Sequence, residues 1–369
     1  MITDSPVSYF KFSDLKSFAE QVFLKIGCNT DDAQLATSVL LKADLRGIDS
    51  HGLARLSGYV RLWQKNRINT QPFLKIIHET PSTATLDADS ALGLISAPHA
   101  MKIAIKKANN CGSGWVAVKN SNHFGIGSYH ALLASEQNMI GFAITNASPL
   151  VAPTFSSERL LGTNPLCWAF PAGKYPPIVI DMATSTAANG KLEIAQRLNK
   201  PIPLGWVQDK MGQVTADAHA LKNGGALLPL GSSREMGSHK GFGLSAVVDL
   251  LSGVLSGANY GPWVPPFVAF LDPLTPPVGD GIGHFVGALR VDAFRPMEEF
   301  ICHIDQWIDR FKSAKRIDSE QAIIIPGEPE FACETERNST GIPLVEAVIV
   351  DLKKLGEELG ISTDFLCLY

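Results

Sequence analysis

This chain lacks several features that would assign it to a familiar class of protein. None of its apolar runs reaches about 18 residues, so no transmembrane helix is expected. Residues 1–6 contain no basic stretch leading into an apolar core, which argues against a secretory signal. The six cysteines include no C-x-x-C pair, which is typical of reduced thiols rather than of a disulfide framework or a zinc cage. These absences predict a cytoplasmic protein without a membrane partner.

Charge and catalytic signatures exclude further classes. The net charge of -4 gives no electrostatic reason to bind nucleic acid or an anionic membrane. The signatures G-x-S-x-G, H-E-x-x-H and G-x-x-x-x-G-K-[ST] do not occur, which removes the usual support for a hydrolase, a zinc protease or a P-loop enzyme. His123 and His130 are too far apart for one helical face, and no acid or cysteine completes a ligand set. No metal is expected, and the expected partner is a small molecule.

Length and composition indicate a soluble enzyme with a sizeable core. The chain has 369 residues, of which 45% are hydrophobic and 18% charged. A chain of this length and composition suggests two domains, or one large hydrophobic core with an additional segment outside it. Apolar residues at helical spacing predict helices over 13–27, over 30–47 and from Ser50 onward, and again over 297–314 and 344–359 near the C-terminus.

Between these helical ends, short β-rich runs alternate with helical segments. Residues 199–240 and 256–283 are rich in Pro and Gly and are expected to be surface loops. The pattern predicts an α/β (mixed α+β) fold with a mixed sheet. One helical domain would combine residues 1–75 with about 300–369, and the sheet domain would cover 76–299. Strands are predicted at 84–86, 114–118, 140–144, 167–170, 178–181 and 284–289, and helices at 96–109, 127–137, 182–198 and 241–255.

The segment Ala43–Arg55 concentrates chemistry-bearing residues between two predicted helices. If helix restarts at Ser50, His51 and Arg55 are four residues apart and share one face. A proton donor beside a guanidinium is what a small α-keto or α-hydroxy acid needs. The alternative is that Ser50 only caps a helix and His51 lies exposed in its first turn.

Two further segments follow predicted strands, where α/β sheets place ligand groups. Ser121–Gly127 opens a helix, and its glycines would let backbone amides approach a phosphate. Asp181–Ser185 offers an acid and hydroxyls that could hold a ribose or a nicotinamide. Each could equally be a polar turn or a helix cap. The turn Leu161–Leu166 contains only the ordinary Asn-Pro signal.

The string Gly241–Ala246 has the form G-x-G-x-x-A and opens a helix. A dinucleotide fingerprint should follow a hydrophobic strand, and residues 231–238 are not one, so the Rossmann interpretation is rejected. Lys240 at the start of that helix remains a plausible anion contact.

Taken in order, these segments closely resemble the type 2 malate/L-lactate dehydrogenase family over about residues 10–360. That family also includes ureidoglycolate dehydrogenase, diketogulonate reductase, sulfolactate dehydrogenase and the piperideine-carboxylate reductases. The matching segments are Leu45–Gly52, Ser121–Gly125, Leu161–Pro165, Asp181–Ser185, Lys240–Gly241 and Pro326–Pro329.

The resemblance implies a non-Rossmann NAD(P)-binding sheet, a helical domain built from both termini, and a homodimer with the active site near the interface. It implies hydride transfer between a nicotinamide cofactor and a small 2-hydroxy or 2-keto acid, with malate or L-lactate expected first. Ureidoglycolate, sulfolactate and sugar acids remain alternative substrates, and NADP an alternative to NAD. A non-catalytic NAD(P)-binding protein on the same scaffold is the alternative outside enzymes.

The resemblance also assigns roles to residues. His51 would be the catalytic acid/base, Ser50 its hydrogen-bonding partner, Arg55 the clamp for the substrate carboxylate, and His123 a second active-site histidine near the nicotinamide. Lys191 stands where some relatives carry an acid that completes a Ser-His-Asp relay, which disfavours the imine reductases and leaves open what orients His51. The implied cofactor contacts are His123, Gly125, Asp181, Met182, Ala183, Thr184, Lys240, Gly241, Pro326, Gly327 and Glu328.

Overall fold

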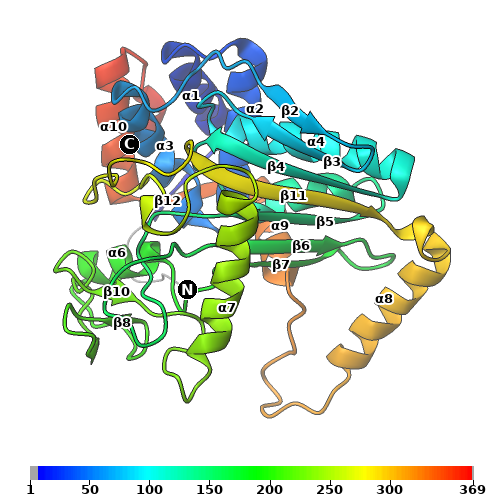
Figure 1. Cartoon of the computed structure of the whole chain (residues 1–369). Coiled ribbons are helices and arrows are strands. Elements are labelled where there is room, and N and C mark those ends of the chain that lie inside the picture. The colour runs from blue at the N-terminus through cyan, green and yellow to red at the C-terminus, as the bar shows by residue number, and fades with distance from the viewer. Residues whose placement is uncertain (1–6, 368–369) are drawn as a thin grey trace.

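A mixed sheet of seven strands forms the centre of the computed structural model, which describes residues 7–367 (Figure 1). Residues 1–6, on which the expectation about a signal rests, lie outside the described range. Among neighbouring strands in the described sheet only β3 and β4 run parallel, so the predicted mixed sheet is confirmed. The strand order is β2 (Lys75–Glu79), β3 (Thr83–Asp87), β4 (Ser113–Ser121), β11 (Ile282–Arg290), β5 (Met139–Thr145), β6 (Leu166–Phe170) and β7 (Ile178–Met182).

Two helices, α4 (Gly93–Cys111) and α5 (Gly127–Ser135), pack against one face of this sheet. α4 contributes a stripe of small apolar residues, including Ala100 and Ala104, which lets its backbone approach the central strands. Val116 and Val286 meet this stripe from β4 and β11. This contact forms the core of the sheet part of the molecule.

A second core lies where the two ends of the chain meet. The helices α1 (Phe12–Lys25), α2 (Thr30–Leu45), α3 (Leu56–Gln64) and α10 (Glu346–Leu359) share it. Strand β1 (Val7–Phe10) pairs antiparallel with β12 (Ile342–Val345) and holds the ends together. No helix among residues 7–367 combines the length and the apolar character that a membrane span requires.

Three further helices lie around the sheet. Helix α6 (Asn189–Arg197) follows β7, and α8 (Met297–Lys312) packs on the strands β6 and β7 through Ile304 and Ile308. Helix α7 (Ser238–Asp249) continues through a π-helical turn to Val254 and stands in front of the sheet (Figure 1).

Some predicted elements were wrong or missing. The third helix does not restart at Ser50, because two 3₁₀ turns, Asp49–His51 and Leu53–Arg55, precede α3. Helix α9 (Glu328–Thr340) was not predicted, since it buries none of its residues and so has no apolar stripe. The strands β1, β2 and β12 were also missed, as were three short strands within 199–240: β8 (Val207–Gln208), β9 (Val214–Thr215) and β10 (Ala226–Leu227).

Candidate active site

The buried carboxyl group of Asp44 holds the junction between α2 and α3 in place. Asp44 is 2% exposed, and its Oδ2 accepts a hydrogen bond from the Leu53 backbone N–H at 2.8 Å. A Cβ on Gly52 would collide with this carboxylate, so glycine is required there. Arg337 of α9 donates to the Asp44 carbonyl and to the Asp49 carboxylate. These bonds fasten the segment 49–55 to two helices.

The charged residues of this junction are less exposed than the sequence suggests. The sequence predicts that Asp44, Arg46 and Asp49 are helix-end and interface charges, yet Asp44 and Arg46 are buried and only Asp49 is partly exposed. Arg46 reaches Glu334 on α9 and lies over the Phe331 ring. Burial raises the pKa of Asp44 to about 8. These groups stabilise the junction and are not part of an exposed interface.

Ser50 and His51 form a hydrogen-bonded pair. The Ser50 hydroxyl and His51 Nδ1 are 2.9 Å apart, which leaves Nε2 for a substrate. Burial, with the nearby charge of Arg55, lowers the pKa of His51 to about 4. The imidazole is therefore neutral at pH 7 and can accept a proton.

The prediction that Arg55 and His51 share a helical face was wrong, because two 3₁₀ turns replace the helix. Arg55 instead folds back onto the turn that carries Ser50 and His51. Its Nε donates to the Ser50 carbonyl at 2.6 Å, and its Nη2 lies 3.9 Å from Glu193 on α6. The distance to Glu193 is longer than a hydrogen bond, so a substrate carboxylate could still bind the Nη1/Nη2 end of the guanidinium, in competition with Glu193.

Helix α6 contacts the pair without supplying a relay acid. A Cβ built on Gly190 would lie 2.9 Å from Ser50 Cβ, which places the start of α6 against the junction. Lys191 is exposed and its Nζ lies 5.5 Å from the centre of the Trp206 ring. The partner that orients His51 at Nδ1 is thus Ser50.

His123 comes from the loop after β4 and stacks on His51, with ring centroids 5.6 Å apart. Its Nδ1 lies 2.7 Å from the Tyr59 hydroxyl. Burial and the charges of His51 and Arg55 hold the pKa of His123 well below its ordinary value. The structure therefore brings all four predicted catalytic residues, Ser50, His51, Arg55 and His123, into one cluster.

Two members of this cluster were missed. Tyr59 is buried on α3, four residues after Arg55, a spacing that could have identified it. Phe267 comes from the long loop before β11, and its ring centroid lies 4.7 Å from that of His123. Nothing in the Pro- and Gly-rich sequence around it signals this position.

The side chains predicted to contact the cofactor near β7 are partly used for internal bonds. Asp181 Oδ2 accepts from the Ser128 N–H at 2.7 Å, so it caps α5 and not the helix that follows it in sequence. Thr184 donates its hydroxyl to the carbonyls of Thr163 and Asn164. Strand β7 ends at Met182, and Ala183 and Thr184 follow it directly. The turn Leu161–Leu166 therefore has a structural role, since its carbonyls hold the Thr184 side chain in place.

The remaining predicted cofactor residues lie near the two ends of strand β7. The Leu230 N–H donates to the Thr184 carbonyl at 2.9 Å, and Gly241 packs directly on Leu230. This brings the start of α7, with the exposed Lys240, beside Thr184.

The turn Pro326–Glu328 lies at the other end of the strand. The Pro326 carbonyl accepts from Val179 of β7 at 3.0 Å. Gly327 lies against Val179, while Glu328 pairs with Lys312 and accepts from Ile325.

The loop 122–127 connects this region to the catalytic cluster. His123 lies at its start, and the Gly125 N–H donates to His123 Nδ1 at 3.3 Å. At its end, a Cβ on Gly127 would lie 3.1 Å from Asp181 Oδ1. The loop thus spans from the histidine pair to the end of β7.

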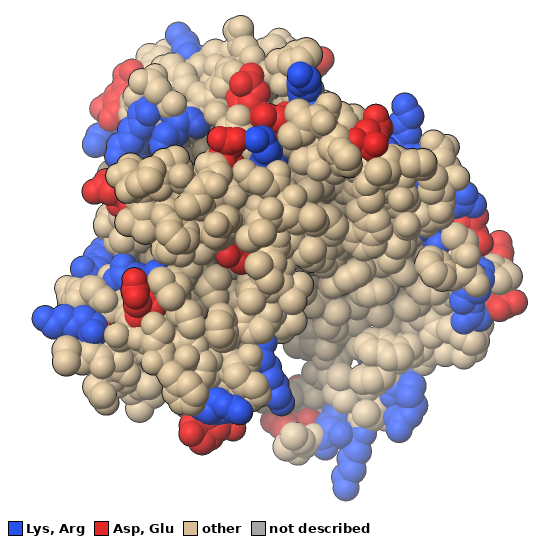
Figure 2. Space-filling model, in the orientation of Figure 1, with Lys and Arg blue, Asp and Glu red and all other residues tan. Residues whose placement is uncertain are grey.

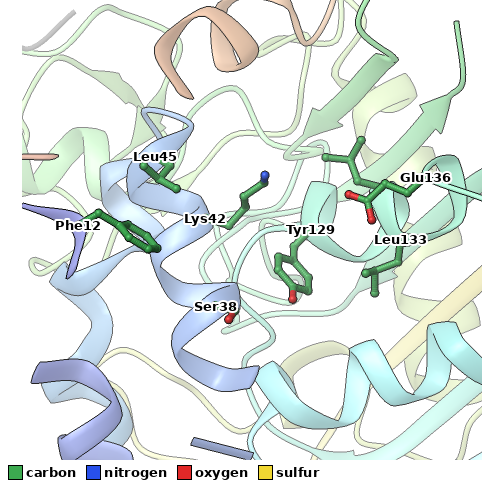
Figure 3. Close-up of a pocket in the computed structure, with 8 residues that line it drawn as sticks. Phe12, Ser38, Lys42, Leu45, Tyr129, Leu133 and Glu136 are labelled. Atoms are coloured by element: carbon green, nitrogen blue, oxygen red, sulfur yellow. The ribbon is translucent and has the colours of Figure 1, made fainter. Parts of the chain in front are cut away.

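Two cavities of the molecule lie elsewhere. One of about 230 Å³ lies between α2 and α5, lined by Lys42, Tyr129 and Glu136 among others (Figure 3). Another, of about 420 Å³, is lined by residues such as Asn138 and Arg290. Neither is lined by a candidate catalytic or cofactor residue of the described chain, and Lys42 is already paired with Glu334. Within residues 7–367, no group of three or more His, Cys, Asp or Glu side chains is arranged to hold a metal.

Sequence and fold both resemble known proteins. A family described as Malate/L-lactate dehydrogenase matches residues 10–353. The malate dehydrogenase of Pyrococcus horikoshii is 41% identical over 349 residues, which cover 94% of each chain. The L-sulfolactate dehydrogenase of Methanocaldococcus jannaschii is 36% identical over 95% of this chain and 96% of its own. The crystal structure of malate dehydrogenase from Entamoeba histolytica has a TM-score of 0.90 at 32% identity, covering 97% of this chain and 100% of that one.

Two buried histidines behind the site make stability depend on pH. Burial lowers the pKa of His130 to about 4, and burial with the charge of His130 lowers that of His284 to about 3. In the unfolded chain both titrate near about 6.5, so below that pH the unfolded state binds protons that the native state does not. The free energy of unfolding should fall by about 2 kcal/mol per histidine between pH 7 and pH 5.

Urea unfolding at the two pH values measures this loss. His130→Gln should reduce it by about 2 kcal/mol, whereas His78→Gln, at an exposed position, should not. An equal loss in all three proteins would show that the buried histidines do not cause it.

Proposed function

Since the chain belongs to the malate/L-lactate dehydrogenase family and is a dehydrogenase of 2-hydroxy acids, we propose that it interconverts malate and oxaloacetate. The observation that carries this proposal is the half-buried cluster of Ser50, His51, Arg55 and His123. Malate is favoured because the relatives named malate dehydrogenase share 41% and 42% identity over nearly the whole chain. Sulfolactate, also a dianion, is the second candidate because a relative with that activity is 36% identical.

Arg55 supplies the recognition of the acid. Its Nε is already held by the Ser50 carbonyl, so the guanidinium is oriented before substrate arrives. The substrate carboxylate binds its Nη1/Nη2 end through two parallel charge-assisted hydrogen bonds. The neighbouring C2 carbon is then placed beside His51.

His51 moves the proton. In the oxidation of malate the neutral imidazole takes the hydroxyl proton at Nε2, and in the reverse direction the imidazolium returns it to the carbonyl oxygen. Ser50 holds Nδ1 during both directions. The His123 ring, held by Tyr59, stacks on one face of His51 and limits the directions from which water or substrate can approach it.

A nicotinamide cofactor, expected to be NAD, would supply or accept the hydride when bound. The exposed ammonium of Lys240 and the backbone N–H groups in the first turn of α7 suit the pyrophosphate. Gly125 and the backbone of Met182–Ala183 would contact the rest of the dinucleotide. Since only β3 and β4 of the sheet are parallel, this binding surface would be of a non-Rossmann type.

We propose that two copies of the chain pair through the face of α7. Figure 2 shows few charged side chains over this helix and the strands behind it, with charges gathered toward the edges. Behind α7, the aromatic side chains of Trp115, Trp168 and Phe285 are only partly buried. Such a large apolar face indicates an interface. The exposed apolar residues of the helix and its π turn are Leu244, Val247, Leu250, Val254 and Leu255, each between 41% and 59% exposed.

The two-domain division also belongs to this proposal. Residues 1–75 with about 300–369 would form the helical part and 76–299 the cofactor-binding part, although α8 packs on the strands β6 and β7 of the second part. A cytoplasmic location is supported by the six cysteines, which are all unpaired.

A panel of cofactors and 2-keto acids tests the substrate. NADH and NADPH are each mixed with oxaloacetate, pyruvate and 3-sulfopyruvate, and the loss of absorbance is followed. We expect the highest kcat/KM for NADH with oxaloacetate. Binding of NADH without turnover of any acid would instead identify a binding protein without activity.

Two substitutions test the assigned roles. His51→Ala should lower kcat by about two to four orders of magnitude, the range for a lost general acid or base. Arg55→Lys should mainly raise KM, since an ammonium group cannot form the two parallel bonds. Lys65→Ala, at an exposed position after α3, serves as the control. Unchanged turnover in His51→Ala would remove His51 from the mechanism.

Sedimentation analysis tests the interface. Val247→Glu places a charge on a side chain that is 52% exposed in the centre of the apolar stripe, so it should halve the particle mass. Met211→Glu, at a 72% exposed apolar residue in the β8–β9 turn, should keep the dimer. A dimer that survives Val247→Glu would place the interface elsewhere.

A further inference from the structure

A short segment of the loop before β11, residues 264–270, crosses α3 and is fastened at its middle. We call it the strap. The Phe267 N–H donates to Ser148 Oγ at 2.9 Å. The Phe267 carbonyl accepts a hydrogen bond from Arg61 in the last turn of α3. The Pro266 carbonyl accepts one from Arg67, which follows this helix. These bonds hold the backbone of Phe267 in one place although the loop around it has no regular structure.

The strap presses the Phe267 ring into the catalytic cluster. The ring is 7% exposed and rests on α3 at Gly58, where any Cβ would collide with it. Its centroid lies 4.7 Å from that of His123 and 5.2 Å from that of Tyr59. The guanidinium carbon of Arg55 lies 6.0 Å from the same centroid. Phe267 therefore contacts the second histidine and lies beside the carboxylate clamp.

This position limits the space around a bound acid. A carboxylate held by Arg55 has its carbon about 4 Å from the guanidinium carbon, given ordinary charge-assisted hydrogen bonds. The C2 substituent begins one bond further on. If the C2 hydroxyl of this acid faces His51, the C2 substituent would lie near the rings of His123 and Phe267, whose centroids are 4.7 Å apart.

We propose that Phe267 is a specificity-determining residue, whose ring restricts the enzyme to 2-hydroxy acids with a short, unbranched C2 substituent. This proposal rests on the proposed function, because it takes Arg55 as the carboxylate clamp. The chemical class admitted includes malate, lactate and sulfolactate. Acids with an aromatic or branched substituent are excluded because the ring already fills the space.

Removal of the ring should create a matching space. Phe267→Ala deletes a phenyl group, and phenylpyruvate carries a phenyl group at the corresponding end of a 2-keto acid. The ratio of kcat/KM for phenylpyruvate to that for oxaloacetate should rise at least about tenfold, a typical discrimination for a changed apolar contact. A purely structural role of the ring would lower both values together and leave this ratio unchanged.

Two further variants keep the experiment decisive. Phe270→Ala removes an aromatic ring from the same strap, at a residue that is 38% exposed, and should leave the ratio within about twofold of the wild type. Phe267→Leu keeps an apolar side chain in the core and should give a smaller rise in the ratio if Phe267→Ala does not fold.

The outcome separates this proposal from the proposed function. If the wild type reduces pyruvate or 3-sulfopyruvate but not oxaloacetate, the assigned substrate is wrong and the ratio is taken with the acid that is used. A ratio that stays unchanged in both Phe267 variants, while the wild type is active, overturns the role of Phe267.

Discussion

The active centre depends on one buried hydrogen bond, from the Leu53 backbone N–H to the Asp44 carboxyl group. It joins the last turn of α2 to the irregular segment that carries Ser50, His51 and Arg55. Gly52 makes room for the carboxylate, and Arg337 of α9 binds the same segment from the other side. An unpaired buried N–H costs about 1–3 kcal/mol, a sizeable part of a total stability of about 5–15 kcal/mol. The chemistry of His51 is thus tied to the stability of the helical core.

Burial then sets the protonation of the centre. His51 and His123 stack on each other in a desolvated position beside Arg55, and their pKa values are lowered for the same reasons. Because both pKa values lie below the neutral range, both rings are neutral at pH 7 in the free enzyme. A carboxylate bound to Arg55 would offset the charge that helps to lower the pKa of His51. Substrate binding would thereby prepare this histidine to hold the proton that it exchanges with the substrate.

The sequence predicted much of this arrangement, and the remainder has identifiable physical causes. Helices such as α1 and α2 have buried stripes and ended near the expected residues, and the four catalytic residues stood in recognisable segments. Helix α9 carries no apolar stripe, and the 3₁₀ turns at 49–55 are held by bonds such as that from Leu53 to Asp44, nine residues away, so local patterns could not reveal them. Phe267 is placed at the site by the bonds of the strap to Arg61, Arg67 and Ser148, which are far from it in the sequence.

The most direct test of this account is a crystal structure of the enzyme with NAD(H) and oxamate, an unreactive mimic of a 2-keto acid. The account predicts the oxamate carboxylate on the Nη1/Nη2 end of Arg55 and its amide carbonyl oxygen within hydrogen-bonding distance of His51 Nε2. A carboxylate bound elsewhere, with His51 facing away from oxamate, would contradict it.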